Sequence, residues 1–201
     1  MMLRCKLVFV VVLASMLVIG TSARAAEPAL HSGASLVTGM VGYATHKSEL
    51  SSDQIGGGTW SVTYGRVNSG GDWSAGLALT RIETAEEFVR SDGVLVNANY
   101  ARLVPAVQGR FFPSVGRLST YLGLQLGLHL QTGSGTVGSD ELRDSNQTFA
   151  FGATAGAMAF ISSSTFLQAS YVFYYFSDSA TIKNNHMHTF FGGLGFQFGV
   201  Q

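Results

Sequence analysis

A His-x-His motif is the feature of this sequence most suited to chemistry. His186 and His188 lie in the stretch NNHMHTF, and Asp178 precedes them in the same connecting segment. Two imidazoles two residues apart point to the same side of a strand, where they can bind one metal ion. In a loop the same side chains are solvated and bind nothing. We interpret both as solvated loop histidines and expect neither a metal site nor a cofactor.

Acidic residues gather in GSDELRDSN, at 138–146. Asp140, Glu141, Asp144 and Asn146 supply the oxygen atoms that calcium prefers, but calcium needs several of them converging on one point. We interpret the stretch as a solvated acidic loop. His129 falls on the polar side of a predicted strand, so we expect it to be an interior hydrogen-bonding residue and not a catalyst.

The first 25 residues have the features of a secretory signal peptide. Arg4 and Lys6 precede the apolar stretch LVFVVVLASMLVIG, and Ala23 and Ala25 then occupy the positions of an A-x-A cleavage site. This pattern predicts cleavage after Ala25. A single-pass membrane anchor is the alternative, which the short apolar stretch and the small-residue site disfavour.

Removing the signal peptide changes the charge balance. The full chain has 12 basic and 12 acidic residues, and the loss of Arg4, Lys6 and Arg24 leaves nine basic against twelve acidic, a net charge of about −3. We therefore expect no nucleic-acid partner, because such a partner requires a basic surface. Cys5, the only cysteine, is also removed, so the mature chain can form no disulfide.

The rest of the chain is hydrophobic without long hydrophobic runs. Only 12% of its residues are charged, and the mean hydropathy is +0.25. Beyond the signal peptide, no apolar run approaches the roughly 20 residues that a membrane helix needs. Apolar residues instead alternate with polar or small ones, which predicts β-strands. Eight segments show this alternation: 35–45, 58–67, 73–82, 103–112, 119–131, 147–161, 166–176 and 190–200.

The fourth segment is the least regular of the eight. The stretch VLVNANYA before it alternates on the opposite parity. A β-bulge near Arg102 would reconcile the two stretches.

The connections between these segments alternate in length. Tight turns are expected at 68–72, 113–117 and 162–165, and long polar loops at 46–57, 83–98, 132–146 and 177–186. Short turns at one end and long loops at the other are typical of an up-and-down antiparallel meander. All twelve acidic residues lie outside the eight segments, whereas a soluble sandwich would be expected to carry charge on its outer face.

These patterns predict an all-β, eight-stranded antiparallel up-and-down transmembrane barrel. Strands span a bilayer only when the sheet closes, because every backbone group must then be paired inside the protein. The expected organisation is a signal peptide at 1–25, a short leader at 26–33 and the barrel at 34–201. A soluble β-barrel with the same aromatic residues in its core is the alternative.

The two faces of the predicted barrel have different roles. Aromatic girdles at the two lipid interfaces are expected to contain Trp60, Tyr64, Trp73, Phe111, Tyr171 and Tyr175. The interior, or lumen, is expected to contain Gln108, Arg110, Tyr121, Gln125 and His129. Of the residues expected inside, only Arg110 carries a permanent charge. Inward glycines at 123, 127, 152, 156, 193 and 195 are expected to leave gaps that do not join into a wide channel, because eight strands enclose an interior that side chains fill.

The sequence also resembles a known family. The stretch VPAVQGRFFPSVGRLSTYLGLQLGL is similar to the fourth strand, tight turn and fifth strand of the small OmpA/OmpX-like outer-membrane β-barrel proteins, and the likeness in pattern covers about residues 34–201. The ending, with Phe196, Phe198 and Val200 on one parity, resembles the outer-membrane assembly signal. It departs from that signal by finishing on Val200–Gln201 instead of an aromatic residue.

The resemblance implies a location and partners. It implies a monomeric porin-like barrel in the bacterial outer membrane, with its leader in the periplasm. Its implied partners are membrane lipid, lipopolysaccharide and the assembly machinery.

Three classes of function fit such a barrel: a scaffold that presents surface loops, a small passive pore, and a lipid A-modifying enzyme. Lipid A 3-O-deacylases, a related family, carry a His-x-Ser on a late strand. The corresponding place here is Tyr175–Phe176–Ser177, which lacks the histidine. A serine without a base is a weak nucleophile. We therefore expect a non-enzymatic scaffold for envelope integrity, adhesion or ligand interaction.

Overall fold

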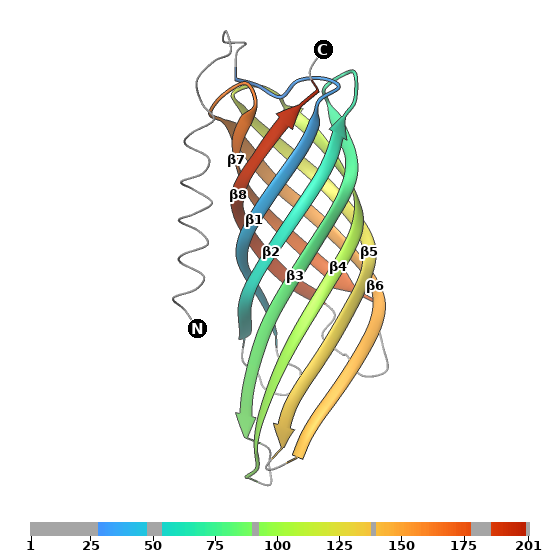
Figure 1. Ribbon diagram of the computed structural model, residues 1–201, viewed down its shortest axis with the longest axis vertical. Coiled ribbons are helices and arrows are strands. Elements are labelled where there is room, and N and C mark those ends of the chain that lie inside the picture. The colour runs from blue at the N-terminus through green and yellow to red at the C-terminus, as the bar shows by residue number, and fades with distance from the viewer. Residues whose placement is uncertain (1–27, 48–53, 90–92, 138–139, 178–185, 200–201) are drawn as a thin grey trace.

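Alternating side chains along eight strands close into one antiparallel β-barrel in the computed structural model (Figure 1). The structure describes residues 28–47, 54–89, 93–137, 140–177 and 186–199. The strands are β1 (Ser35–Lys47), β2 (Gln54–Val67), β3 (Trp73–Val89), β4 (Leu95–Ser114), β5 (Leu118–Val137), β6 (Asp140–Phe160), β7 (Thr165–Phe176) and β8 (His186–Phe198). The predicted fold class is confirmed. Within the described ranges, no helix is long and apolar enough to cross a membrane.

The last strand is covered by the first. β8 pairs with β1 from Ser35 opposite Phe198 to Thr45 opposite His188. The body of the sheet therefore has no open edge that would need protection. The start of β1, the end of β8 and the three short connections lie at one end of the barrel, which we call the turn end (Figure 1). The opposite end is the loop end.

Four strands are longer than the sequence pattern predicts. β3, β4, β5 and β6 contain 17, 20, 20 and 21 residues, whereas the other four contain 12 to 14. The loops expected at 83–98 and 132–146 are therefore wrong, because most of their residues continue these strands past the others at the loop end (Figure 1). We call this part of the sheet the extension: 83–89 of β3, 95–101 of β4, 132–137 of β5 and 140–145 of β6.

The bulge expected near Arg102 is also absent. β4 and β5 keep one register from Val96 opposite Val137 to Phe111 opposite Leu122, and the shift occurs only between Phe111 and Ser114. Along β4, apolar residues face outward in the barrel body and inward in the extension. This switch follows the change of the outer surface from apolar to polar and involves no shift of the strand register. Val96 points inward within the extension, where polar residues face outward.

The lumen contains two apolar layers with a polar layer between them. The layer at the turn end is formed by Leu30, Leu36, Val67, Phe112, Tyr121, Met158, Phe160 and Phe166. The second layer is formed by Met40, Ala44, Ile82, Val104, Ala150, Val172, Tyr174, Phe176, Met187 and Phe191. Along β1, β4, β6 and β7, which contribute to both layers, buried polar residues fall between the two, such as Thr38 on β1 and Gln108 on β4.

Candidate functional site

The outer surface of the barrel body is a belt of exposed apolar side chains. One row runs directly across five strands: Leu77, Val107, Leu126, Phe151 and Tyr175. All five are exposed although they lie on a sheet with a filled interior. An exposed apolar surface of this extent marks an interaction with lipid or with another protein.

The aromatic residues assigned to the girdles all lie on this outer face. Trp60, Tyr64, Trp73, Phe111 and Tyr175 are exposed, and Tyr171 is half-buried beside Phe190. Trp73 lies opposite Phe111 near the turn end. Tyr171 lies opposite Phe190, which lies opposite Tyr43, nearer the loop end.

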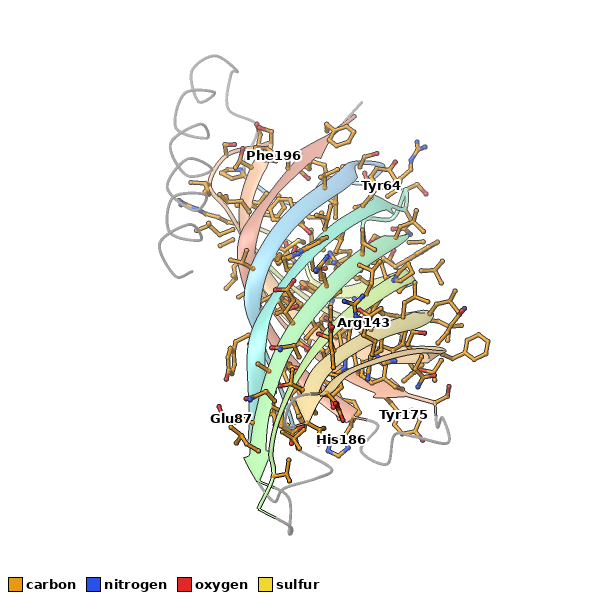
Figure 2. The ribbon with its side chains drawn as sticks, turned by 60° about the horizontal axis from the view of Figure 1, so that its bottom comes forward. Tyr64, Glu87, Arg143, Tyr175, His186 and Phe196 are labelled. Atoms are coloured by element: carbon orange, nitrogen blue, oxygen red, sulfur yellow. The ribbon has the colours of Figure 1, made fainter. Side chains whose placement is uncertain are left out.

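At the extension the outer face changes from apolar to polar. Three successive rows cross β3, β4, β5 and β6: Glu83, Ala101, Thr132 and Ser145; then Ala85, Asn99, Ser134 and Arg143; then Glu87, Asn97, Thr136 and Glu141. The extension continues for six or seven residues on each strand, roughly 20 Å at about 3.3 Å per residue. A four-stranded polar sheet thus projects beyond the apolar belt, and Figure 2 labels Glu87 and Arg143 on its strands.

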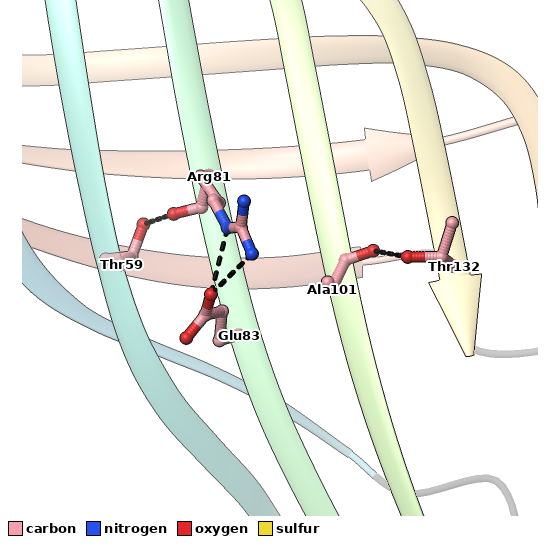
Figure 3. A network of polar contacts seen from close by, with 5 residues as sticks. All are labelled: Thr59, Arg81, Glu83, Ala101 and Thr132. Atoms are coloured by element: carbon pink, nitrogen blue, oxygen red, sulfur yellow. Dashed lines mark hydrogen bonds and ion pairs between the residues drawn. The ribbon is translucent and has the colours of Figure 1, made fainter. Parts of the chain in front are cut away.

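Two ion pairs lie on this polar sheet, each between residues of a single strand. Arg81 contacts Glu83 at 2.8 Å, and Arg143 contacts Glu141 at 2.9 Å. Figure 3 shows the first pair beside the hydrogen bond from Thr132 Oγ1 to the carbonyl oxygen of Ala101. Exposed pairs of this kind contribute little to stability. The extension as a whole is acidic, because its strands contain Glu83, Glu86, Glu87, Asp140, Glu141 and Asp144 against Arg143.

An open groove of about 880 Å³ lies on the extension. Most of its lining side chains point outward: Glu83, Ala85, Asn99, Ala101, Thr132, Ser134, Glu141, Arg143 and Ser145. Hydroxyl, amide, carboxylate and guanidinium groups therefore offer both donors and acceptors along one surface. The prediction of an acidic loop at 138–146 is wrong, because Asp140, Glu141 and Asn146 lie on strand β6.

The residues assigned to the lumen are all buried inside the barrel. Arg110 donates from Nη2 to Gln108 Oε1 at 3.1 Å and to Thr63 Oγ1 at 3.3 Å. Its guanidinium also lies over the Tyr121 ring, 4.9 Å from the centroid. The partners of this buried charge are therefore neutral acceptors and a π face and not a carboxylate, and Nε is buried without a hydrogen-bond partner.

Two further lumen groups are held by hydrogen bonds. Tyr174 donates to Gln125 Oε1 at 2.9 Å. His129 Nδ1 lies 3.0 Å from Thr148 Oγ1, and its ring stacks on Phe176 at 4.0 Å between centroids. His129 is therefore an interior hydrogen-bonding residue.

The inward glycines do not leave gaps, which corrects the prediction. A Cβ at Gly156 would lie 2.5 Å from the Tyr121 ring, and one at Gly195 would lie 2.2 Å from the Phe166 ring. A Cβ at Gly127 would meet the carbonyl oxygen of Pro105. Large inward rings and neighbouring backbone occupy the space that these glycines provide.

The sequence prediction missed a second inward cation. Arg102 is buried and donates to Gln131 Oε1 at 3.1 Å and to Thr84 Oγ1 at 3.2 Å. Arg102 and Arg110 are an even number of residues apart on β4, so a strand without a bulge places both side chains inside. The assumed bulge reversed its parity.

The leader closes the turn end of the lumen. Leu30 is buried in the apolar layer there. Gln197, buried on β8, donates to the carbonyl oxygen of Ala29, and its Oε1 accepts from the backbone N–H of His31. On the other side of β8, Phe198 is exposed and Phe196 is half-buried, whereas Val200 lies outside the described residues.

The histidine pair lies on a strand and not in a loop, contrary to the prediction. His186 and His188 belong to β8, with ring centroids 5.9 Å apart. Asp178 lies outside the described residues, and the Ser177 hydroxyl accepts a hydrogen bond from the backbone N–H of Phe149. In the described part of the chain, no three or more His, Cys, Asp or Glu side chains group to hold a metal.

Comparisons with known proteins agree with this architecture. The family described as outer membrane protein beta-barrel domain matches residues 11–198. Neisserial surface protein A, a similar solved structure, has a TM-score of 0.59 and 18% identity, covering 83% of this chain and all of that one. OprG from Pseudomonas aeruginosa has a TM-score of 0.57 and 12% identity, covering 86% of this chain and 99% of that one.

A third similar structure is Ail, the attachment invasion locus protein of Yersinia pestis. It has a TM-score of 0.51 and 17% identity, and the match covers 83% of this chain and 99% of that one. No curated protein sequence matches the chain. At these identities the solved structures establish the fold alone.

Proposed function

Because this chain belongs to the outer membrane protein beta-barrel domain family and lies in the outer membrane, we propose that it is a non-enzymatic scaffold whose extension contacts lipopolysaccharide. In this family of folds short turns face the periplasm and the longer connections face outward. The extension then lies outside the cell. The observation that carries the proposal is the sharp change on its outer face, from the Leu126 row to the Thr132 row.

The position of the polar rows favours a saccharide partner. Leu130, two residues before Thr132 on β5, is the last outward-facing apolar residue of the belt on that strand. We therefore expect Thr132 and Ser134 to lie where lipid headgroups give way to sugars. Sugars present many hydroxyls, which are both donors and acceptors, and the groove offers both kinds of partner. Acidic residues outnumber basic ones on the extension, and a surface of that sign does not favour a nucleic acid.

A pore is less well supported by the structure. Rings of Tyr121, Tyr174 and Phe166 occupy the interior across the space left by glycines. The leader packs Leu30 into the turn end. These contacts favour a packed core over a conducting channel.

Two register-matched pairs of substitutions test the proposal. Asn99 and Ser134 are cross-strand neighbours within the groove, whereas Asn97 and Thr136 are neighbours one row farther and do not line it. The measurement is the rise in unfolding temperature when lipopolysaccharide is added to phospholipid bilayers that contain the protein. We expect Asn99→Ala/Ser134→Ala to reduce this rise and Asn97→Ala/Thr136→Ala to preserve it.

Three results would count against the proposal. The wild-type protein could respond equally to lipopolysaccharide and to phospholipid, or both double variants could behave alike. Hydrolysis of lipid A acyl chains by the purified protein would instead move it to the class of lipid-modifying enzymes.

A further inference from the structure

The two histidines of the His-x-His motif face outward from the same side of β8. His186 is exposed and His188 is half-buried, while Met187 between them is buried in the lumen. Their ring centroids are 5.9 Å apart, with an angle of 84° between the planes. Figure 2 shows His186 at the loop end, near Tyr175. Thr45, opposite His188, lies two residues beyond Tyr43, so the pair lies just past the aromatic row of Tyr43, Phe190 and Tyr171.

Tyr171 orients the second of these rings. Its hydroxyl oxygen lies 2.6 Å from His188 Nδ1. Histidines that bind metals almost always engage their other ring nitrogen with a hydrogen-bond partner, which fixes the ring and leaves one nitrogen for the ion. When Nδ1–H donates to Tyr171, the lone pair of His188 Nε2 is free.

Phe173 holds both rings from the neighbouring strand. Its centroid lies 5.3 Å from that of His188 and 6.2 Å from that of His186. The two imidazoles are therefore positioned by β7 before any ligand arrives, and this preorganisation lowers the entropic cost of binding.

We propose that His186 and His188 together bind one divalent transition-metal ion on the outer rim of the barrel. A zinc–imidazole bond is about 2.0–2.1 Å long, which places an ion roughly 3 Å from each ring centre. Two ring centres 5.9 Å apart can therefore flank a single ion. Imidazole ligands suit Zn²⁺, Ni²⁺ and Cu²⁺, with Cu²⁺ the strongest by the general order of affinities.

The proposed site is an open one. Two imidazoles fill only half of a tetrahedral zinc sphere, so water or an external ligand takes the other positions. The ion is then exchangeable and is not needed for folding. This distinguishes the site from a structural zinc centre, whose loss unfolds the protein.

The other three histidines serve as an internal comparison for metal binding by His186 and His188. His46 and His129 are buried in the lumen, and His31 lies at the turn end, where its backbone N–H bonds to Gln197. His31→Gln is therefore the matched control for loss of one accessible imidazole.

The experiment uses the untagged mature protein folded in detergent. Calorimetric titration with Zn²⁺ gives the affinity, and the nitrogen hyperfine pattern of bound Cu²⁺ in electron paramagnetic resonance counts the imidazole ligands. We expect two nitrogens in the wild type, one in His186→Gln or His188→Gln, and a loss of zinc affinity of at least about tenfold in each. His31→Gln should match the wild type.

Tyr171→Phe separates an organised site from two incidental surface histidines. It keeps the ring beside Phe190 and both imidazoles but removes the hydroxyl that meets His188 Nδ1. Loss of such a partner typically costs about 10–100-fold in metal affinity, and we expect a loss in that range. Unchanged zinc affinity in the His186→Gln/His188→Gln double variant, or a single-nitrogen Cu²⁺ spectrum for the wild type, would overturn the proposal.

Discussion

Gln197 Nε2, near the end of β8, donates a hydrogen bond of 2.7 Å to the carbonyl oxygen of Ala29, 168 residues earlier in the chain. The same carboxamide donates to the carbonyl oxygen of Ser163 and accepts from the backbone N–H of His31. One buried side chain thereby joins the leader, the β6–β7 turn and the last strand. The described part of the leader, 28–33, is therefore a structural part of the barrel.

Gln197→Leu should release the leader. The substitution keeps a similar volume but removes all three hydrogen bonds and leaves partly buried backbone groups without these partners, which costs about 1–3 kcal/mol. Hydrogen exchange should accelerate at the Gly33 amide, which bonds to the Asn68 carbonyl oxygen. The control is Gln147→Leu on the exposed face of β6, for which we expect a change within about 0.5 kcal/mol. Unaltered exchange at Gly33 in Gln197→Leu would show that the leader is held by other contacts.

Large rings lie against the inward glycines, so a glycine-to-alanine substitution should destabilise the barrel more at an inward position than at an outward one. Tyr121 lies directly opposite Gly156, and a Cβ there would meet both the Tyr121 ring and the carbonyl oxygen of Ala169 at 2.5 Å. Gly156→Ala should therefore destabilise the barrel by about 1–3 kcal/mol through overpacking. Gly192→Ala, on β8 with nothing within 4 Å of its added Cβ, should be nearly neutral. Urea unfolding in bilayers measures both, and equal losses would contradict this account of the interior.

The same packing predicts a barrel without a wide channel. Tyr121 and Tyr174 are almost completely buried, and both are held by hydrogen bonds across the lumen. Planar-bilayer recording of the refolded wild-type protein should show no large, long-lived conductance steps beyond those of the detergent control. Reproducible steps of that kind would place the protein among the pores.

Two arginine substitutions on one face of β5 test where the membrane ends. Leu126 and Ser134 both point outward, but Leu126 is 58% exposed within the apolar belt and Ser134 lies in the extension. Leu126→Arg should cost about 2–4 kcal/mol near the bilayer centre, whereas Ser134→Arg should cost about 0–1 kcal/mol. Folding yield in bilayers measures the difference. Similar yields for the two variants would mean that the polar rows do not mark the boundary.

The sequence was sufficient to predict the barrel because strand periodicity is a local property. Leu122 to Leu130 alternate with small and polar residues regardless of what surrounds the strand. The extension escaped prediction because its outward residues are polar, so apolar residues do not alternate with polar ones there in the pattern of the barrel body. Once the outer face meets water, Glu83 and Arg143 face outward on regular strands, and their charge is easily taken for a loop.

The site details depend on register, which one sequence does not reveal. Nothing local indicates that Gly156 lies opposite Tyr121, or Gly152 opposite Tyr174. The spacing of His186 and His188 puts them on one face of a strand if they lie on a strand. The sequence does not show that β8 begins as early as His186. Their contact with Tyr171 requires the pairing of β7 with β8.

A double-mutant cycle tests the buried pair of Arg110 and Gln108. Both lie on the inward face of β4, and Arg110 Nη2 donates to Gln108 Oε1 at 3.1 Å. Gln108→Leu removes an acceptor from a buried cation and should cost about 1.5–3 kcal/mol, the range for hydrogen bonds to charged groups. Arg110→Met removes the charge itself, and replacing a buried charge by an apolar group of similar size is often neutral or stabilising.

The coupling between these two substitutions is the measured quantity. In the Arg110→Met background, Gln108→Leu no longer leaves a cation without its acceptor, so its cost should fall toward the loss of the weaker bond from Gln108 Nε2 to the Leu77 carbonyl oxygen. Contacting residues in one network typically couple by about 0.5–3 kcal/mol, and urea unfolding of the four proteins resolves such a term. If Gln108→Leu costs the same in both backgrounds, Gln108 does not stabilise the charge, and the face of Tyr121 and Thr63 Oγ1 are its effective partners.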